Sequence, residues 1–243
     1  MMKDKVVIVT GGAKGIGRYV AGTFAREGAK LAIADIDTMR LDKTFKELQD
    51  QGADVLAVRA DVRNEYDVRS LMAEVAGRFG KIDVLINNAG VVTHFQWGIS
   101  RWPRIRDIDK DFWERVIQTN LGGTFLCTKH ALPYMEKRRS GHIIGLHGGG
   151  SGDGACAYGV SKEAIRLFTR YVADEEKESN ICVVAVAPGG AIATEDAPEE
   201  ARRRMPGVEL VGNRFVLAAQ VGMEMSGELL TLKDGKLEVI AGR

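Results

Sequence analysis

Two separate stretches of this sequence carry residues whose types and spacing suit proton exchange beside a bound dinucleotide. Tyr158 stands four positions before Lys162, so on a helix the phenol and the ammonium lie on one face. A free phenol has a pKa of about 10, and we expect the charge of Lys162, with that of an oxidised nicotinamide, to lower it. Alone, this spacing is typical of a solvated helix face. Combined with the second stretch, it predicts that Tyr158 exchanges a proton with a substrate oxygen.

The second stretch, residues 10–17, reads Thr-Gly-Gly-Ala-Lys-Gly-Ile-Gly and links an apolar run to a helical segment. Gly11 permits a tight turn, while Gly15 and Gly17 let the backbone approach a pyrophosphate and let the helix pack on the sheet. The N–H groups at the start of the helix can donate to phosphate oxygens. The turn therefore predicts a dinucleotide site, with cofactor contacts from Gly11, Lys14, Gly15, Ile16 and Gly17.

An acidic residue ends the next predicted strand. Asp35 follows Gly17 by 18 residues, where a carboxylate hydrogen-bonds the adenosine ribose hydroxyls. The alternative is an ordinary turn acid, because Asp favours strand ends. Lys14 could meet a 2′-phosphate or the pyrophosphate, but a carboxylate at the ribose repels a 2′-phosphate. Asp35 therefore predicts NAD as the cofactor.

Strands and helices alternate along the chain. Apolar runs predict strands at 5–10, 31–34, 55–59, 82–86, 142–146 and 181–186. Helical periodicity and stop signals predict helices from the glycine turn to about 28, then at 41–51, 68–79, 109–137 and 158–176. This order predicts a doubly wound α/β fold, the Rossmann fold, with a parallel sheet covered on both faces and one domain over residues 1–243. Ligands of such sheets bind at the carboxyl ends of the strands.

The composition of the chain argues against nucleic acid, a membrane and a metal ion as binding partners. The chain has 243 residues and a formal net charge of +1, which gives no global field for nucleic acid or a membrane surface. Its apolar runs are too short to cross a bilayer. The three cysteines show neither metal-ligand spacing nor a disulfide framework, so we expect no metal site and a cytoplasmic location.

Taken together, these motifs resemble the short-chain dehydrogenase/reductase family of the ordinary cytosolic type, over nearly the whole chain. The resemblance rests on the glycine turn, Asp61-Val62, Asn87-Asn88-Ala89-Gly90, Asn120, Tyr158 with Lys162, and Pro188-Gly189. It implies further cofactor contacts from Asp61 and Val62 at the adenine, then from Asn88, Ala89, Gly90, Pro188, Gly189, and from Ile192 and Thr194 at the carboxamide.

The same resemblance implies catalytic roles and an assembly. Lys162 binds the nicotinamide ribose as well as acting on Tyr158, and Asn120 bends its helix to hold a water in a proton relay. The resemblance also implies a homodimer or homotetramer that packs the helices at 109–137 and 158–176 against a neighbour.

One expected residue of the family is missing. Members usually carry a Ser just after the fifth strand, where this chain has Gly148 by strand alignment, or a residue near Gly145 by counting back from Tyr158. Neither glycine has a hydroxyl. His147 and Ser151 are the candidates to replace it as a donor to the substrate oxygen. If the strand alternates regularly, His147 points to the other face. The alternatives are a strand-end histidine and a loop serine that take no part in the chemistry.

The segment after Gly90 is longer than the family's common form. It places Arg101, Arg104 and Arg106 beside two tryptophans, and an arginine fork suits a carboxylate substrate. A surface loop or a subunit contact explains the segment equally well.

These inferences predict an NAD-dependent oxidoreductase that transfers a hydride between the nicotinamide and a small secondary alcohol or ketone. Tyr158, Lys162 and Asn120 are the predicted catalytic residues. Two alternatives stay open: a weakly catalytic cofactor-binding or sensor protein, which the missing Ser suggests, and a lyase or epimerase on the same fold. The sequence does not name the substrate, the direction or the stereochemistry.

Overall fold

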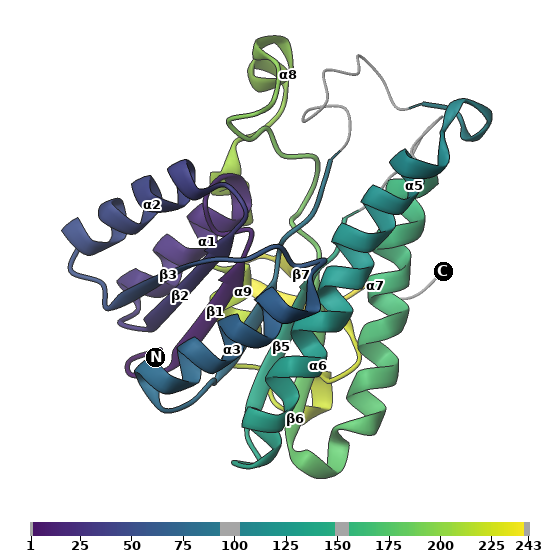
Figure 1. Ribbon diagram of the computed structural model, residues 1–243. Helices are drawn as coiled ribbons and strands as arrows, with labels where there is room; N and C mark the ends of the chain where they lie inside the picture. Colours follow the sequence, from purple (N-terminus) through teal and green to yellow (C-terminus); the bar gives the residue numbers. More distant parts are fainter. Residues whose placement is uncertain (1, 93–102, 149–155, 241–243) are drawn as a thin grey trace.

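A computed structural model describes residues 2–92, 103–148 and 156–240 (Figure 1). Its centre is a sheet in the order β3-β2-β1-β4-β5-β6-β7-β8, in which every pairing is parallel except that of β7 with β8. The strands are β1 (Val6–Thr10), β2 (Lys30–Asp35), β3 (Val55–Arg59), β4 (Val84–Asn87), β5 (Gly141–Leu146), β6 (Ile181–Val186), β7 (Leu229–Lys233) and β8 (Lys236–Val239). The predicted doubly wound α/β fold is confirmed.

Helices cover both faces of the sheet, and its strands β1, β4 and β6 are buried at every position. Val7 and Val9 of β1 belong to the core beneath α1 (Gly15–Arg26), α2 (Thr38–Asp50) and α9 (Arg214–Ala218). Val6 and Ile8 point the other way, into the core beneath α3 (Glu65–Phe79), α6 (Gly123–Glu136) and α7 (Cys156–Glu175). All four side chains are fully buried, as expected for a strand between two helical layers.

Local capping explains where several helices begin and end. Asn64 accepts hydrogen bonds from the N–H groups of Tyr66 and Asp67 and so caps α3, which ends at Gly80 with φ at 79°. Asp37 caps α2 in the same way. In contrast, α1 begins after Lys14 with no hydrogen bond from that residue's own side chain. The N–H groups at the start of α1 are therefore available to a partner from elsewhere.

The expected helix over 109–137 is not one regular helix. It consists of α5 (Lys110–Ile117), a π-helical turn (Gln118–Gly122) and α6. A π turn inserts extra backbone into a helix and is often found at functional sites. Asn120, which the family resemblance assigned to a bend, lies at the middle of this turn.

Two strands were missing from the sequence prediction. β7 and β8 form a hairpin at the edge of the sheet, joined by Asp234 and Gly235, both with positive φ. A short exposed helix, α8 (Glu199–Arg204), follows β6. The sheet order changes direction between β1 and β4, so the connections after these two strands run to opposite sides. Such a switch point leaves a crevice at the carboxyl ends of the strands.

Candidate active site

A cleft of about 1280 Å³ opens at the carboxyl ends of the strands, where the switch point predicts a ligand site. It brings together all of the residues predicted to contact a cofactor. They are Gly11, Lys14, Gly15, Ile16, Gly17, Asp35, Asp61, Val62, Asn88, Ala89, Gly90, Tyr158, Lys162, Pro188, Gly189, Ile192 and Thr194. Gly11 and Thr194, which lie far apart in the sequence, thus line one cavity.

The glycine turn needs its glycines for close backbone approach. A Cβ at Gly17 would overlap the carbonyl oxygen of Gly11, so the helix packs directly on the turn. Asn88 donates from its amide to the carbonyl oxygens of Thr10 at 2.8 Å and Gly11 at 3.0 Å. The end of β4 is thereby tied to the end of β1. The ends of these two strands therefore form one floor of the cleft, built largely from backbone atoms.

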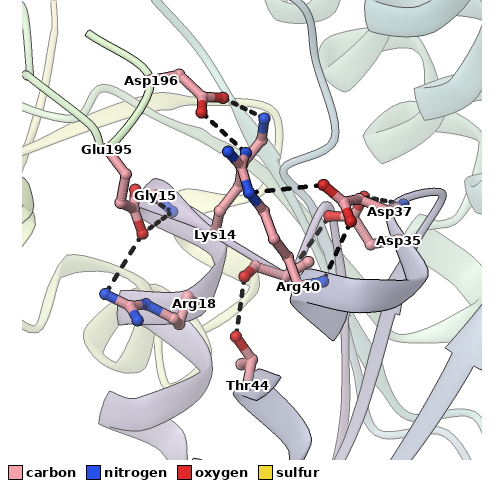
Figure 2. Close-up of polar contacts among 10 residues, drawn as sticks. Lys14, Gly15, Arg18, Asp35, Asp37, Arg40, Thr44, Glu195 and Asp196 are labelled. Carbon is pink, nitrogen blue, oxygen red and sulfur yellow. Dashed lines mark hydrogen bonds and ion pairs between the residues drawn. The ribbon is translucent and has the colours of Figure 1, made fainter. Parts of the chain in front are cut away.

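The N-terminus of α1 already holds an anion, as Figure 2 shows. The backbone N–H of Gly15 donates to the carboxylate of Glu195, with distances of 3.1 and 2.8 Å to its two oxygens. Arg18 lies 3.3 Å from the same carboxylate. A carboxylate thus stands where the helix start would receive a phosphate, and this chain's own residues fit the pyrophosphate of a dinucleotide.

Asp35 faces the cleft from the end of β2. Its carboxylate accepts hydrogen bonds from the backbone N–H of Ala13 and of Asp37, each at 3.1 Å. These bonds fix the carboxylate at the edge of the glycine turn (Figure 2). A fixed acceptor at this place suits the hydroxyl groups of an adenosine ribose.

Tyr158 and Lys162 meet at the other end of the cleft, where α7 passes β5. The Lys162 ammonium nitrogen lies 5.7 Å from the centroid of the Tyr158 ring and donates to the carbonyl oxygen of Leu146 at 2.9 Å. Lys162 is buried, with 3% of its surface exposed. The phenol and the ammonium therefore share one apolar corner, as their spacing predicts.

The expectation of a lowered phenol pKa is wrong for the protein by itself. Burial raises the pKa of Tyr158 to about 12, and burial lowers the pKa of Lys162 to about 8. The reason is that low polarity disfavours both the phenolate and the ammonium, and the ammonium is directed at a backbone carbonyl. Tyr158 is consequently a neutral phenol at pH 7 and is poised to donate a proton.

Asn120 is completely buried and links three elements. Its carbonyl oxygen accepts from the N–H of Val91 at 2.8 Å, and its amide donates to Ser161 at 3.0 Å. Ser161 in turn donates to the carbonyl oxygen of Tyr158 at 2.7 Å. Asn120 therefore connects the loop after β4 to the first turn of α7. Sequence reasoning did not single out Ser161, which lies between Tyr158 and Lys162.

Comparison with known proteins identifies the family of this chain. A family model for the short chain dehydrogenases matches residues 5–204. The chain belongs to the short-chain dehydrogenase/reductase family. It is 32% identical over 250 residues to a cyclopentanol dehydrogenase of Comamonas testosteroni, covering 99% of this chain and 94% of the relative.

Other curated relatives of the family are similar at the same level. A 3-oxoacyl-[acyl-carrier-protein] reductase FabG of Staphylococcus aureus is 33% identical over 211 residues, covering 84% of this chain and 82% of the relative. The (2S)-[(R)-hydroxy(phenyl)methyl]succinyl-CoA dehydrogenase subunit BbsD of Thauera aromatica is 33% identical over 190 residues, covering 77% and 73%. Family membership makes the chain an oxidoreductase of alcohols or ketones that uses a nicotinamide dinucleotide, NAD or NADP.

Gly148, where the family's Ser is expected, lies against the hydroxyl group of Tyr158. A Cβ at Gly148 would stand 2.5 Å from the Tyr158 hydroxyl oxygen, closer than atoms pack. Its next neighbours, the ring carbon bearing that hydroxyl and Lys162, are at ordinary contact distances of 3.4 and 3.7 Å. In this structure the Tyr158 hydroxyl occupies the space that a side chain at residue 148 requires.

The two candidates to replace the Ser have different outcomes. Ser151 lies outside the described residues. His147 is among the residues that line the cleft, and its Nε2 lies 3.4 Å from the carboxylate of Glu163, which does not line it. Within the described part of the chain, that Nε2 atom is buried and makes no hydrogen bond. Burial lowers the pKa of His147, so the imidazole is neutral at pH 7.

The arginines of the segment after Gly90 do not line the cleft where the structure describes them. Arg101 lies outside the described residues, as do both tryptophans of the segment. Arg104 and Arg106 are exposed and are not among the residues that line the cleft. Arg115 of α5 and Thr119 of the π-helical turn do line it. The periodicity of the sequence does not connect either residue with the cleft.

Over residues 2–92, 103–148 and 156–240, no group of three or more His, Cys, Asp or Glu side chains is arranged to hold a metal ion. Among the helices of these ranges, none is both long and apolar enough to span a membrane.

Proposed function

We propose that this chain is an NAD-dependent dehydrogenase or reductase of a secondary alcohol or ketone, with Tyr158 as its proton-exchanging residue. One observation carries the proposal: a single cleft joins Tyr158 and Lys162 to the glycine turn and Asp35. A proton donor and a dinucleotide floor in one cavity are what this reaction requires. The domain assignment over residues 1–243 belongs to the same proposal.

The residues divide between holding the cofactor and moving the proton. Gly11, Gly15 and Gly17 form the floor for the pyrophosphate, and Asp35 accepts from the ribose hydroxyls. When bound, the nicotinamide donates or accepts the hydride at the carbinol carbon. Tyr158 donates a proton to the developing alkoxide in reduction and accepts the alcohol proton in oxidation. Lys162 donates to Leu146 and holds positive charge beside the phenol.

Tyr158 depends on a buried polar network for its position. Asn120 and Ser161 fix the backbone carbonyl of Tyr158 and so the first turn of α7. We assign Asn120 the role of a positioning residue, because its side-chain hydrogen bonds go to Val91 and Ser161. A relay water would be held by backbone groups of the π turn that Asn120 stabilises.

The names of the relatives support the substrate class. Cyclopentanol is a secondary alcohol, a 3-oxoacyl group is a ketone, and a hydroxy(phenyl)methyl group is a secondary alcohol. Outside this reacting group, the substrates named for the three relatives differ widely. We therefore extend to this chain the reacting group that they share and no particular molecule.

We expect NAD to bind at least about tenfold more tightly than NADP, because the fixed Asp35 carboxylate repels a 2′-phosphate. Titration of both dinucleotides by intrinsic fluorescence measures the two dissociation constants. Asp35→Asn serves as the matched variant, since it keeps the size and removes the charge. Equal or tighter binding of NADP by the unaltered protein would contradict the choice of NAD.

We also propose that the chain forms a homodimer or homotetramer through α6 and α7, which cover the same face of the sheet (Figure 1). Val160, Leu167 and Tyr171 form a stripe along α7, and Phe125 is exposed on α6. Their exposed fractions are 46, 51, 64 and 46%, which is high for apolar side chains gathered on two helices.

Light scattering is expected to give two or four times the chain mass of 26.5 kDa. Tyr171→Glu with Leu167→Glu is expected to reduce that mass, because two charges would be buried at the contact. A mass of one chain for the unaltered protein would contradict the assembly. A cytoplasmic location is part of the same proposal and is supported by three free cysteines, Cys127, Cys156 and Cys182.

A further inference from the structure

Two cations from distant elements converge at the edge of the cleft beside Asp35. Lys14 comes from the glycine turn and Arg40 from the first turn of α2, and both line the cleft. Figure 2 shows their side chains reaching toward one point. Two converging cations are the arrangement by which proteins bind a phosphate monoester or a carboxylate.

The occupant of that point is a residue of this chain. The Asp196 carboxylate forms an ion pair with Lys14 through one oxygen and with Arg40, at 2.8 Å, through the other. The Asp196 side chain is 17% exposed. Although burial opposes its ionisation, Lys14 and Arg40 hold the pKa of Asp196 below the ordinary value. Asp196 is therefore a full negative charge at pH 7, fixed between two cations.

Asp196 lies on the loop after β6, and Glu195 beside it has a different partner. Glu195 accepts from the Gly15 N–H and lies near Arg18, at the place of the pyrophosphate. The two adjacent carboxylates thus act at two positions along the cleft. Glu195 stands at the helix start, which any dinucleotide requires, and Asp196 stands nearer the ribose end marked by Asp35.

The local charge balance opposes an additional phosphate. Among the residues labelled in Figure 2, four carboxylates, Asp35, Asp37, Glu195 and Asp196, face three cations, Lys14, Arg18 and Arg40. A 2′-phosphate adds nearly two negative charges to this group. Without Asp196, Lys14 would be left to pair with a phosphate, together with Arg40, which would keep only its 3.6 Å ion pair with Asp37.

We propose that Asp196 is a determinant of cofactor choice: its carboxylate takes the place of a phosphate between Lys14 and Arg40 and thereby selects NAD over NADP. This inference rests on the proposed function, because it assumes that a nicotinamide dinucleotide binds in the cleft. Asp196 would thus be a second carboxylate, besides Asp35, that disfavours a 2′-phosphate, and it comes from the loop after β6.

Asp196→Asn tests the proposal, because it keeps the size of the side chain and removes its charge. The dissociation constants of NAD and NADP, and of the fragments 5′-AMP and adenosine 2′,5′-bisphosphate, are measured by isothermal titration calorimetry. We expect the affinity for the 2′-phosphorylated partner of each pair to rise at least about tenfold relative to the other partner. The fragments contain no nicotinamide, so this measurement does not depend on turnover.

Glu195→Gln is the matched control at the neighbouring carboxylate. We expect it to strengthen NAD and NADP equally, since both place a pyrophosphate at the Gly15 N–H. The gain of Asp196→Asn should be lost when Arg40→Met is added, because one of the two cations is then absent. Thermal melting of each variant confirms that it is folded.

The results distinguish a failure of the proposed function from a failure of the role given to Asp196. If the unaltered protein binds neither dinucleotide, the proposed function fails. If it binds NAD and Asp196→Asn leaves the NADP-to-NAD ratio within about twofold, the role of Asp196 alone is overturned. A changed ratio that persists after Arg40→Met would overturn the assignment of the cation pair.

Discussion

Tyr158→Phe is expected to reduce kcat by about 10²–10⁴-fold while leaving the affinity for NAD unchanged. The substitution removes only the hydroxyl, and the ring still packs at the corner shared with Lys162. Since burial keeps this phenol neutral, its loss removes the proton donor of the reduction direction. Steady-state rates with a secondary alcohol or ketone, and NAD binding by fluorescence, measure the two effects.

Ser161→Ala provides a matched control on the same helix turn. It removes a hydroxyl that donates to the carbonyl oxygen of Tyr158 and touches the Asn120 amide, so it alters positioning without removing the acid. A smaller loss of kcat is expected there. If Tyr158→Phe stayed within a few fold of the unaltered protein, Tyr158 would not be the acid or base.

Gly148→Ala is expected to lower kcat by about 10²-fold, because the added methyl forces the Tyr158 hydroxyl out of its place. The clash should also cost about 1–3 kcal/mol of stability, as overpacking does. Gly148→Ser adds the hydroxyl that the family carries at this place, yet it meets the same clash at its Cβ. Assays of kcat and thermal melts of both variants measure these losses.

The double variant Gly148→Ala with Tyr158→Phe tests whether contact with the Tyr158 hydroxyl causes the loss of stability. Without the Tyr158 hydroxyl, the nearest atom to the new methyl is the ring carbon at 3.4 Å, an ordinary contact. The stability lost in Gly148→Ala should therefore largely return in the double variant. Equal losses with and without the hydroxyl would show that contact with Tyr158 is not the reason. A rate gain in Gly148→Ser would show instead that the site lacks a donor.

Much of the fold could be predicted because its central strands are short apolar runs at regular spacing. The runs at 55–59 and 181–186 match β3 and β6 residue for residue. The hairpin of β7 and β8 was missed, although Asp234-Gly235 between two short alternating segments is a typical hairpin signal. The π turn at Asn120 has no such signal in the local sequence, and the partners of its buried amide, Val91 and Ser161, lie in other segments of the chain.

The cofactor end of the site was predictable from its motifs, whereas its charge pattern was not. Glycine spacing and a strand-end acid are local features of the sequence. The ion pair between Lys14 and Asp196 joins residues 182 positions apart, and only the folded chain brings them together. For the same reason, the contact of Gly148 with the Tyr158 hydroxyl changes the interpretation of the missing Ser. The sequence shows only that residue 148 lacks a side chain. The structure shows that the Tyr158 hydroxyl takes up the space that such a side chain would need.

Transfer of label from substrate to cofactor tests the central claim most directly. A secondary alcohol carrying deuterium on its carbinol carbon is incubated with the protein and NAD, and mass spectrometry follows the nicotinamide. We expect the deuterium to appear in the reduced cofactor with the unaltered protein and to be nearly absent with Tyr158→Phe. If NAD binds, yet no label is transferred from any of a panel of such alcohols, and none passes from labelled NADH to the matching ketones, the account is contradicted and a cofactor-binding or sensor role takes its place.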